Sequence, residues 1–338
     1  MVASGARQPH QCQAVVPAPT FAPAAASSRN LAIVWLTGGS KPVVRDITDI
    51  NHPSTVGTLE VPSRFVSASD IAYIDGDGNL VRKAYASSAK VTVARCTALF
   101  DWSPDGAAVV YAVTTDAGMT VHRLVAGHDL VLGSVPGIPA VGCETVAGCF
   151  GADTWDVSLS YSPDGKYISL VISVANASTF RLWTPDGTLV KSSDTSSPFM
   201  SVWSGGSLYF RDAAGVEVWR AGVVSSFLPG VAWIRPKASP AGGQIIYDAR
   251  DAQEWDHTYV VDTASGNVRD LGKAHSGPVF LTSRYAWYQG QRPCVAGDYC
   301  GTRVAGVDNG KTYIFDLQAG TESSSIITNV VDVWPHPA

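Results

Sequence analysis

The sequence has few charged residues, no basic run and no long apolar run. Only 16% of its 338 residues are charged, against roughly 25% in an average soluble domain. The net charge is -5, and we expect no nucleic-acid binding because that function needs a basic stripe. No apolar run approaches the roughly 18 residues that span a bilayer, so we expect no transmembrane segment.

Several catalytic and targeting signatures are missing as well. The sequence has no Gly-x-Ser-x-Gly, no His-Glu-x-x-His, no phosphate-binding glycine loop and no dinucleotide fingerprint. Residues 1–29 lack the basic start and the continuous apolar stretch of a secretory signal. Either there is no signal, or the signal preceded this sequence and was removed.

Turn-forming and aromatic residues are abundant instead. The sequence has 32 glycines, 20 prolines and 10 tryptophans, which suits many short strands joined by tight turns. No stretch keeps a helical period. We therefore expect an all-β fold.

One short turn recurs along the chain. Residues 100–106 read Phe-Asp-Trp-Ser-Pro-Asp-Gly, and residues 159–165 read Leu-Ser-Tyr-Ser-Pro-Asp-Gly; an apolar run follows each. Proline presets φ, aspartate bonds the local backbone and glycine accepts positive φ, so the element predicts a tight hairpin. Weaker copies lie at residues 21–23, 66–68, 202–206, 238–242 and 281–283. Strand and turn alternating about seven times predict a β-propeller.

These repeats resemble those of the TolB-type, or WD40-like, propellers, whose units read aromatic-Ser-Pro-Asp-Gly before a strand. The match is specific at residues 96–140 and 152–193 and follows from pattern elsewhere. The resemblance implies a single propeller of four-stranded antiparallel blades over residues 21–338, after an arm at residues 1–20. We prefer seven blades over six or eight, and we expect residues 330–335 to pair with N-terminal strands.

The six cysteines include two pairs with equal spacing. Cys143 and Cys149 enclose five residues with a glycine, and so do Cys294 and Cys300. Such short loops can close a disulfide, which would indicate an oxidising compartment. Reduced thiols and a metal site are the alternatives. Cys12 and Cys96 remain and could pair with each other.

Propeller topology indicates where a functional site would lie. The Ser-Pro-Asp-Gly turns join strands A and B on one face, so we interpret their aspartates as structural. The connections at residues 134–156, 248–257 and 289–311 lie on the opposite face, formed by the D–A and B–C loops, where function is usual. The polar and aromatic candidates there are Asp153, Trp155, Asp156, Arg235, Lys237, Asp251, Glu254, Trp255, Asp256, His257, His275 and Asp298.

Each candidate has a functional and a structural interpretation. Glu254 or Asp256 with His257 could form an acid–base pair, and Asp156 and His275 are further catalytic candidates. Carboxylates near the axis could hold Ca²⁺. The alternatives are a solvated acidic loop, a strand-capping histidine at His275, and tryptophans that pack blades rather than stack on a ligand.

Two functions from different classes follow. The first is a secreted or periplasmic binding or scaffold propeller, expected to be a monomer, that holds a protein, a peptide or a small-molecule or glycan ligand. The alternative is a metal-assisted hydrolase or lyase that uses the central channel, with Ca²⁺ as cofactor. Resemblance to lactonase, organophosphate hydrolase and sugar lyase propellers implies lactone, ester, phosphotriester or sugar substrates for it. Whether the protein is an enzyme stays open.

Overall fold

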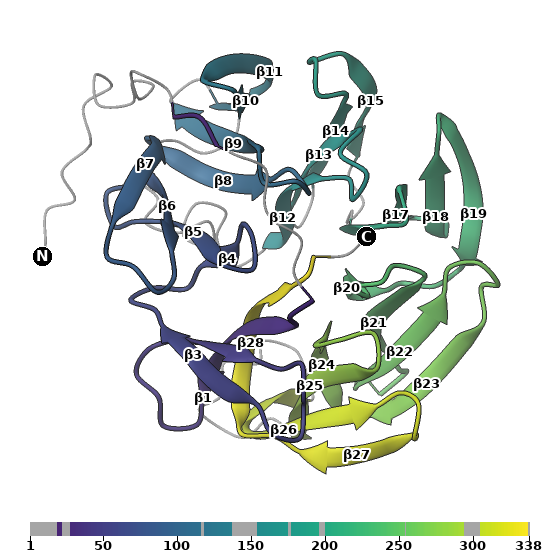
Figure 1. The fold of residues 1–338 in the computed structure, drawn as a ribbon. Helices are drawn as coiled ribbons and strands as arrows, with labels where there is room; N and C mark the ends of the chain where they lie inside the picture. Colours follow the sequence, from purple (N-terminus) through teal and green to yellow (C-terminus); the bar gives the residue numbers. More distant parts are fainter. Residues whose placement is uncertain are drawn as a thin grey trace, which may run out of the picture. The chain divides into compact units, whose positions relative to one another are not determined.

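The computed structural model describes residues 19–21, 28–115, 118–136, 154–174, 177–195, 200–253, 255–293 and 305–336. These residues form 28 strands in seven four-stranded antiparallel sheets (Figure 1). The fold is therefore a seven-bladed β-propeller, which confirms the predicted class and blade number. A helix able to cross a membrane does not occur in this part of the chain.

The chain divides into two compact units, and unit 1 comprises residues 1–27 and 63–199. It holds three sheets, with the strand orders β4-β5-β6-β7, β11-β10-β9-β8 and β12-β13-β14-β15. Their bounds are β4 Arg64–Phe65, β5 Asp70–Ile74, β6 Leu80–Ala84, β7 Lys90–Ala94, β8 Thr97–Trp102, β9 Ala108–Thr115, β10 Gly118–Val125, β11 His128–Pro136, β12 Thr154–Tyr161, β13 Ile168–Val174, β14 Ala177–Trp183 and β15 Leu189–Thr195.

Unit 2 comprises residues 28–62 and 200–338 and holds the other four sheets. Their strand orders are β28-β1-β2-β3, β16-β17-β18-β19, β20-β21-β22-β23 and β24-β25-β26-β27. Their bounds are β1 Leu31–Leu36, β2 Val43–Asp46, β3 Ser54–Thr58, β16 Met200–Ser204, β17 Ser207–Asp212, β18 Gly215–Arg220, β19 Val223–Pro229, β20 Ile234–Ala238, β21 Gln244–Arg250, β22 Asp256–Asp262, β23 Val268–Lys273, β24 His275–Phe280, β25 Tyr285–Pro293, β26 Ala305–Asp316, β27 Thr321–Ser324 and β28 Ile327–Trp334.

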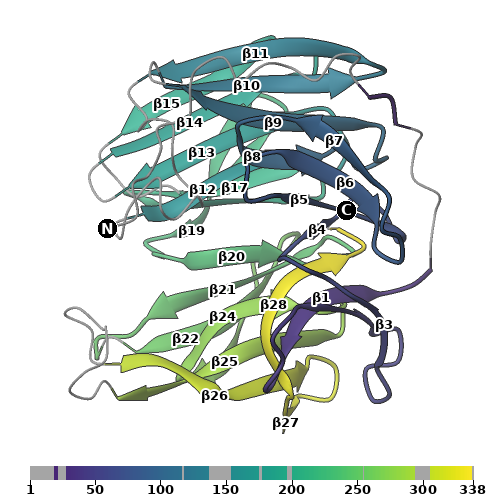
Figure 2. The ribbon, with the colours of Figure 1, turned by 90° about the vertical axis from the view of Figure 1, so that its left-hand side faces the viewer.

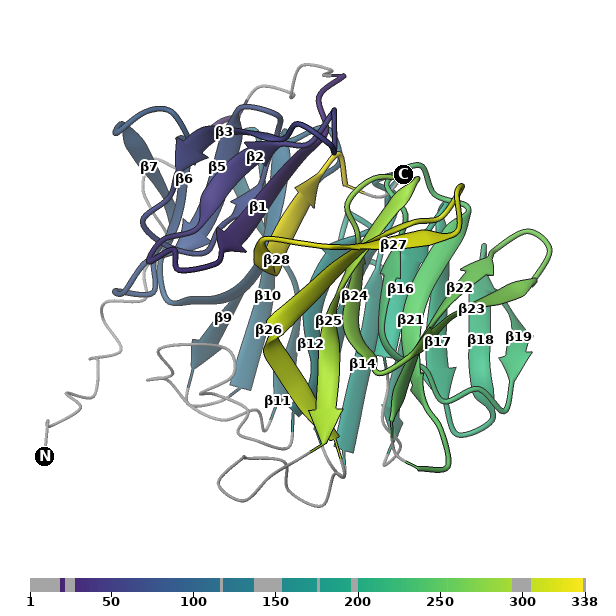
Figure 3. The ribbon, with the colours of Figure 1, turned by 90° about the horizontal axis from the view of Figure 1, so that it is seen from below.

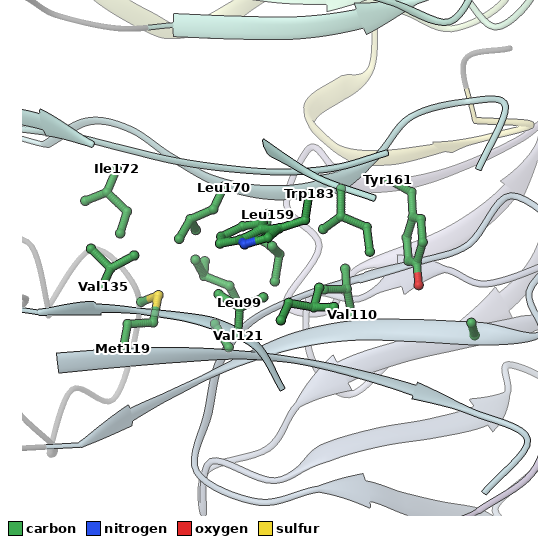
Figure 4. Close-up of a cluster of buried hydrophobic side chains, with 14 residues drawn as sticks. Leu99, Val110, Met119, Val121, Val135, Leu159, Tyr161, Leu170, Ile172 and Trp183 are labelled. Atoms are coloured by element: carbon green, nitrogen blue, oxygen red, sulfur yellow. The ribbon is translucent and has the colours of Figure 1, made fainter. Parts of the chain in front are cut away.

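The position of a strand in its blade explains its sequence. Middle strands such as β13 (ISLVISV) are rich in apolar residues, because both of their faces are buried: Ile168, Leu170 and Ile172 pack against the neighbouring β8–β11 sheet, and Val171 on the other face is 0% exposed. Outer strands such as β15 (LVKSSDT) are largely exposed and carry polar residues. Figure 4 shows one core of unit 1, in which Leu99 and Val121 of one sheet face Leu159 and Leu170 of the next.

The recurrent turns are hairpins with structural aspartates, as predicted. The Ser103 hydroxyl donates to the Asp105 carboxylate at 2.5 Å, and the backbone N–H of Ala108 donates to the Ser103 hydroxyl at 2.8 Å. Gly106 takes φ +69°, a conformation that glycine adopts without strain. The Ser162–Asp164 bond at 2.7 Å repeats the arrangement in the next blade. Each aspartate is thus used to close its own turn.

Strands from both ends of the chain share one sheet. β28 pairs antiparallel with β1, so the expected pairing of residues 330–335 with an N-terminal strand is confirmed (Figure 2). Of residues 21–23, interpreted as a weaker copy of the turn, only Phe21 belongs to the described residues, so that interpretation stays a prediction. Phe21 is outside any strand and packs edge-on against Trp102 with ring centroids 4.7 Å apart. The neighbour of β1 on the side opposite β2 is β28.

Gly215 lies at a position of the β16–β19 sheet where the neighbouring backbone leaves no room for a side chain. It has φ +130°, and an added Cβ would lie 2.6 Å from the Leu228 carbonyl oxygen and 2.5 Å from the Gly230 nitrogen. We expect Gly215→Ala to lower the free energy of unfolding by about 2–3 kcal/mol, measured by urea denaturation. Gly230→Ala is the control: its φ is +73° but nothing lies within 4 Å of the added Cβ, so about 1 kcal/mol is expected. Equal losses would contradict the steric argument.

Candidate functional site

Buried charges lie where the β20–β23 sheet packs against the β24–β27 sheet. In Figure 3, β21 and β24 lie next to each other in this part of unit 2. We define the inter-blade cluster by the six side chains that meet there: Arg235, Asp248, Arg250, Asp256, Ser276 and Gln291. Its residues come from five strands: β20, β21, β22, β24 and β25.

Asp256 is the centre of the inter-blade cluster. Its side chain is fully buried and accepts hydrogen bonds from Arg235 Nη2 at 2.8 Å and Gln291 Nε2 at 3.0 Å. Ser276 Oγ donates at 3.2 Å and Arg250 Nε at 3.4 Å. Because a buried carboxylate is stable only when it is paired and hydrogen-bonded, these four partners explain how the charge is tolerated.

Asp248 is the second buried acid. It is 0% exposed and accepts bonds from Thr258 Oγ1 at 2.9 Å and from the backbone N–H of Gly277 at 2.9 Å. Its Oδ2 lies 3.1 Å from Arg235 Nη2. Burial, which disfavours the charged form, nevertheless raises the pKa of Asp248 to about 7. Asp248 therefore gains or loses its proton near neutral pH.

Arg235 is held in a strained backbone conformation. Its φ is +52°, in the left-handed region that non-glycine residues rarely adopt, and it precedes Pro236, which disfavours helical φ and ψ at the preceding residue. The strand pairing of β20 with β21 is irregular at this point. Such strain persists where surrounding contacts enforce it and is frequent at functional sites. Here the two buried carboxylates supply those contacts.

A second group of residues flanks the cluster, which we call the aromatic edge: Trp255, His257, Tyr259, Lys273 and His275. Lys273 Nζ lies 5.7 Å from the Trp255 ring centroid and 2.7 Å from Asp251 Oδ2. The bond from Lys273 is the main reason that the pKa of Asp251 is lowered to about 2. The Lys273 ammonium group thus lies over the Trp255 ring as in a cation–π contact, and the aromatic edge presents a positive charge beside an apolar ring.

The two histidines of the aromatic edge have separate partners. His257 Nδ1 lies 3.3 Å from Asp270 and Nε2 lies 3.4 Å from Asp251. His275 stacks on Tyr288 with centroids 4.0 Å apart, and its Nε2 lies 3.4 Å from Glu322, which also accepts a hydrogen bond from the Tyr288 hydroxyl. Burial lowers the pKa of His275. His275 therefore does more than cap a strand: its ring stacks on Tyr288 and pairs with Glu322.

The structure brings together several of the predicted residues but arranges them differently from the sequence-based expectation. Residues 248–257 are divided between strand and connection: β21 ends at Arg250, β22 begins at Asp256, and residues 251–253 and 255 lie between them. Asp248 and Asp256, which lie in the strands, are buried and paired with Arg235. Asp256 and His257, expected as a possible acid–base pair, bond to different partners, since adjacent strand residues point to opposite faces. Lys237 is exposed on β20.

The remaining predicted residues lie outside the inter-blade cluster and the aromatic edge, or outside the described residues. Trp155 and Asp156 belong to β12 of unit 1. Asp153, Glu254, Asp298, Cys12 and the paired cysteines Cys143, Cys149, Cys294 and Cys300 are outside the described residues, so the loop disulfides stay predictions. Cys96 is disulfide-bonded, and its pairing with Cys12 stays a prediction.

Four residues of the inter-blade cluster were not predicted as site residues: Asp248, Arg250, Ser276 and Gln291. Only one signal pointed to Asp248: an acid directly after the buried run Ile245–Tyr247, which is unusual for a strand interior. Gln291 carries no local signal, because its importance comes from a bond made to Asp256 across a separation of 35 residues.

A metal site is not evident in the described part of the chain, where no three His, Cys, Asp or Glu side chains are grouped to hold an ion. Residues 75–79, which begin like a calcium loop, form a hairpin turn in which Asp75 Oδ1 accepts the backbone N–H groups of Asp77 and Asn79, each at 2.9 Å.

Fold and site together define a class: a seven-bladed β-propeller with a buried arginine–aspartate cluster between two blades. Neither a protein-family model nor a curated protein sequence matches the chain. Solved structures do match it. One, described as one of two prolyl endopeptidases, is 12% identical with a TM-score of 0.59, covering 94% of this chain and 51% of that one.

Two further structures show the same architecture. An oligogalacturonate lyase in complex with manganese is 12% identical, with a TM-score of 0.54, and covers 90% of this chain and 85% of that one. TolB from Acinetobacter baumannii is 14% identical over 91% of this chain and 82% of that one, with a TM-score of 0.46. At these identities the likeness concerns the fold alone, and at that level the endopeptidase and lyase structures agree with the predicted β-propeller.

Proposed function

We propose that this chain is a binding propeller that holds a protein or peptide ligand where the inter-blade cluster meets the aromatic edge. The observation that carries the proposal is the state of the buried acids: Asp248 and Asp256 are fully bonded within the protein. Partly exposed Trp255, Lys273 and Arg235 lie beside them. Rigid, pre-paired charges next to an aromatic surface favour recognition, because little ordering is needed when a ligand binds.

The proposal extends to compartment and assembly. The two equally spaced cysteine pairs support a secreted or periplasmic protein, since short disulfide loops persist in oxidising surroundings. We propose that the protein acts as a monomer that presents this edge to its ligand. A small-molecule or glycan ligand remains the other binding mode that Trp255 would serve.

Selection from a library of random linear peptides tests the proposal. We expect enriched peptides to bind Trp255→Ala at least about tenfold more weakly than the wild-type protein, equivalent to about 1.4 kcal/mol, by isothermal titration calorimetry. Tyr85→Ala, a partly buried aromatic residue of unit 1, is the matched control and should bind like the wild type.

Two results would oppose the proposal. One is peptide binding that Trp255→Ala leaves unchanged. The other is turnover of a lactone, ester, phosphotriester or oligouronate that a chelator abolishes and a divalent metal restores, which would instead support the metal-assisted hydrolase or lyase.

A further inference from the structure

A third arginine, Arg211, bonds the backbone two residues before Arg235, beside an inter-blade cluster that holds two arginines and two carboxylates. Arg211 lies in β17, Arg235 in β20 and Arg250 in β21. The pKa of Arg211 is lowered, first by burial and then by the positive charge of Arg250, so these two cations lie within electrostatic reach of each other. The group therefore carries more positive than negative charge.

These arginines also keep unused N–H donors. The bonds of Arg235 to the acids all come from Nη2, and its buried Nε has no partner in the described part of the chain. Arg250 bonds Asp256 through Nε at 3.4 Å, and Arg211 bonds the Trp233 carbonyl oxygen through Nη1 at 3.2 Å. A guanidinium presents more donors than these bonds use.

The two buried acids cannot satisfy the remaining donors. Asp248 Oδ1 accepts from Thr258, and its Oδ2 accepts from Gly277 and Arg235. Both oxygens of Asp256 are occupied as well. The side chains of Arg235 and Arg250 are 37% and 33% exposed, so both guanidinium groups are partly accessible from solvent, although Arg235 Nε itself is buried. A further acceptor can reach them from there.

We propose that Arg211, Arg235 and Arg250 bind a carboxylate of the peptide ligand, either its C-terminus or an Asp or Glu side chain. This inference rests on the proposed function, because it names the group by which the peptide is held. Arginine binds carboxylates through paired N–H···O bonds of matching geometry. One carboxylate would also offset the excess charge of the cluster.

A purely structural role explains less of the arrangement. An ion pair within the β20–β23 sheet would need Arg235 and one acid. It does not account for the positive charge of Arg250 acting on Arg211, or for the strained backbone that directs Arg235 into the cluster.

The probes are N-acetyl-Gly-Phe as the free acid and as the amide. Binding to the full chain labelled with ¹⁵N at arginine is followed through the side-chain Nε–H resonances. We expect the free acid to shift the Arg235 resonance saturably and to bind at least about tenfold more tightly than the amide. A peptide with an internal Glu and an amidated end distinguishes a side-chain carboxylate from a C-terminal one.

Variants separate binding from folding. We expect Arg211→Gln to weaken binding of the free acid about tenfold while the protein stays folded, because Arg211 bonds only a carbonyl oxygen. Arg235→Lys, which keeps the charge but loses the paired donors, should also weaken binding. Arg220→Gln removes the same charge from an exposed position of unit 2 and should leave binding unchanged.

Several outcomes would overturn the inference: no binding of the free acid, equal binding of acid and amide, or equal effects of Arg211→Gln and Arg220→Gln. Equal binding of sulfate would show a general anion site, and tighter binding of an oligouronate would show a sugar ligand; either overturns the peptide-carboxylate assignment. If Trp255→Ala still abolishes binding of selected peptides, the proposed function survives that failure.

Asp248 provides a second readout. The groups that face it are Arg235 from β20, Asp256 and Thr258 from β22 and the Gly277 N–H from β24, with Arg250 on its own strand. Protonation of Asp248 removes a negative charge from the cluster, so binding of the free acid should strengthen severalfold from pH 8 to pH 6. Asp248→Asn should remove most of this dependence, and an unchanged dependence would count against the site.

Discussion

Replacing Asp256 by alanine is expected to lower the free energy of unfolding by about 3–5 kcal/mol, the range for breaking a buried ion pair from one side. The physical reason is that Arg235, Arg250, Ser276 and Gln291 all donate to this carboxylate. Alanine would leave those donors without an acceptor and two cations without their counter-charge. Urea denaturation followed by tryptophan fluorescence measures the loss.

The matched control is Asp270→Ala on the same blade. Asp270 pairs with His257, but its side chain is 50% exposed, so about 0–1 kcal/mol is expected. The double variant Asp256→Ala with Arg235→Met should recover part of the loss, since removing both charges avoids an unpaired one. If Asp256→Ala costs no more than Asp270→Ala, the cluster is not a stabilising contact between the two sheets.

The stability contributed by Asp248 is expected to fall as the pH rises. Its pKa is about 7 in the folded protein and 3.8 as a reference, so between these values the folded state keeps a proton that the unfolded state has lost. Stability therefore decreases from about pH 4 to pH 7 and then levels off, by about 4 kcal/mol at most. Asp251, whose pKa is lowered, contributes in the opposite direction, stabilising above its unfolded pKa.

The difference between wild type and Asp248→Asn isolates this residue. Asparagine does not titrate, so the wild type should lose stability relative to the variant between pH 5 and pH 8. Urea midpoints at several pH values measure this change. Parallel pH profiles for the two proteins would show that Asp248 is already charged throughout the range.

Local sequence chemistry was sufficient for the fold. The Ser-Pro-Asp-Gly turns were read correctly because proline, aspartate and glycine act within a few residues, as the bonds around Ser103 and Asp105 show. The apolar middle strands were equally recognisable from the sequence, although β13 also buries Ser169 and Ser173. The predicted pairing of residues 330–335 with an N-terminal strand is found between β28 and β1.

The candidate site was only partly accessible to such reasoning. Arg235, Asp256 and His275 were singled out from their place in the predicted topology. Their partners Gln291 and Ser276 were not predicted, because no local sequence pattern marks them. They reach Asp256 only because one sheet packs on another. The expected Asp256–His257 pair failed for a related reason, since strand geometry sends neighbouring side chains to opposite faces.

By itself, then, the sequence determined the repeated hairpin, the all-β class, the seven sheets and the pairing of the C-terminal segment with an N-terminal strand, because each depends on backbone preferences and apolar patterning. Only the tertiary structure decided that Asp248 and Asp256 are buried rather than solvated, and that Arg235, Ser276 and Gln291 meet around Asp256. Those features depend on contacts between residues far apart in the chain, where burial and charge pairing, not local propensity, set the outcome.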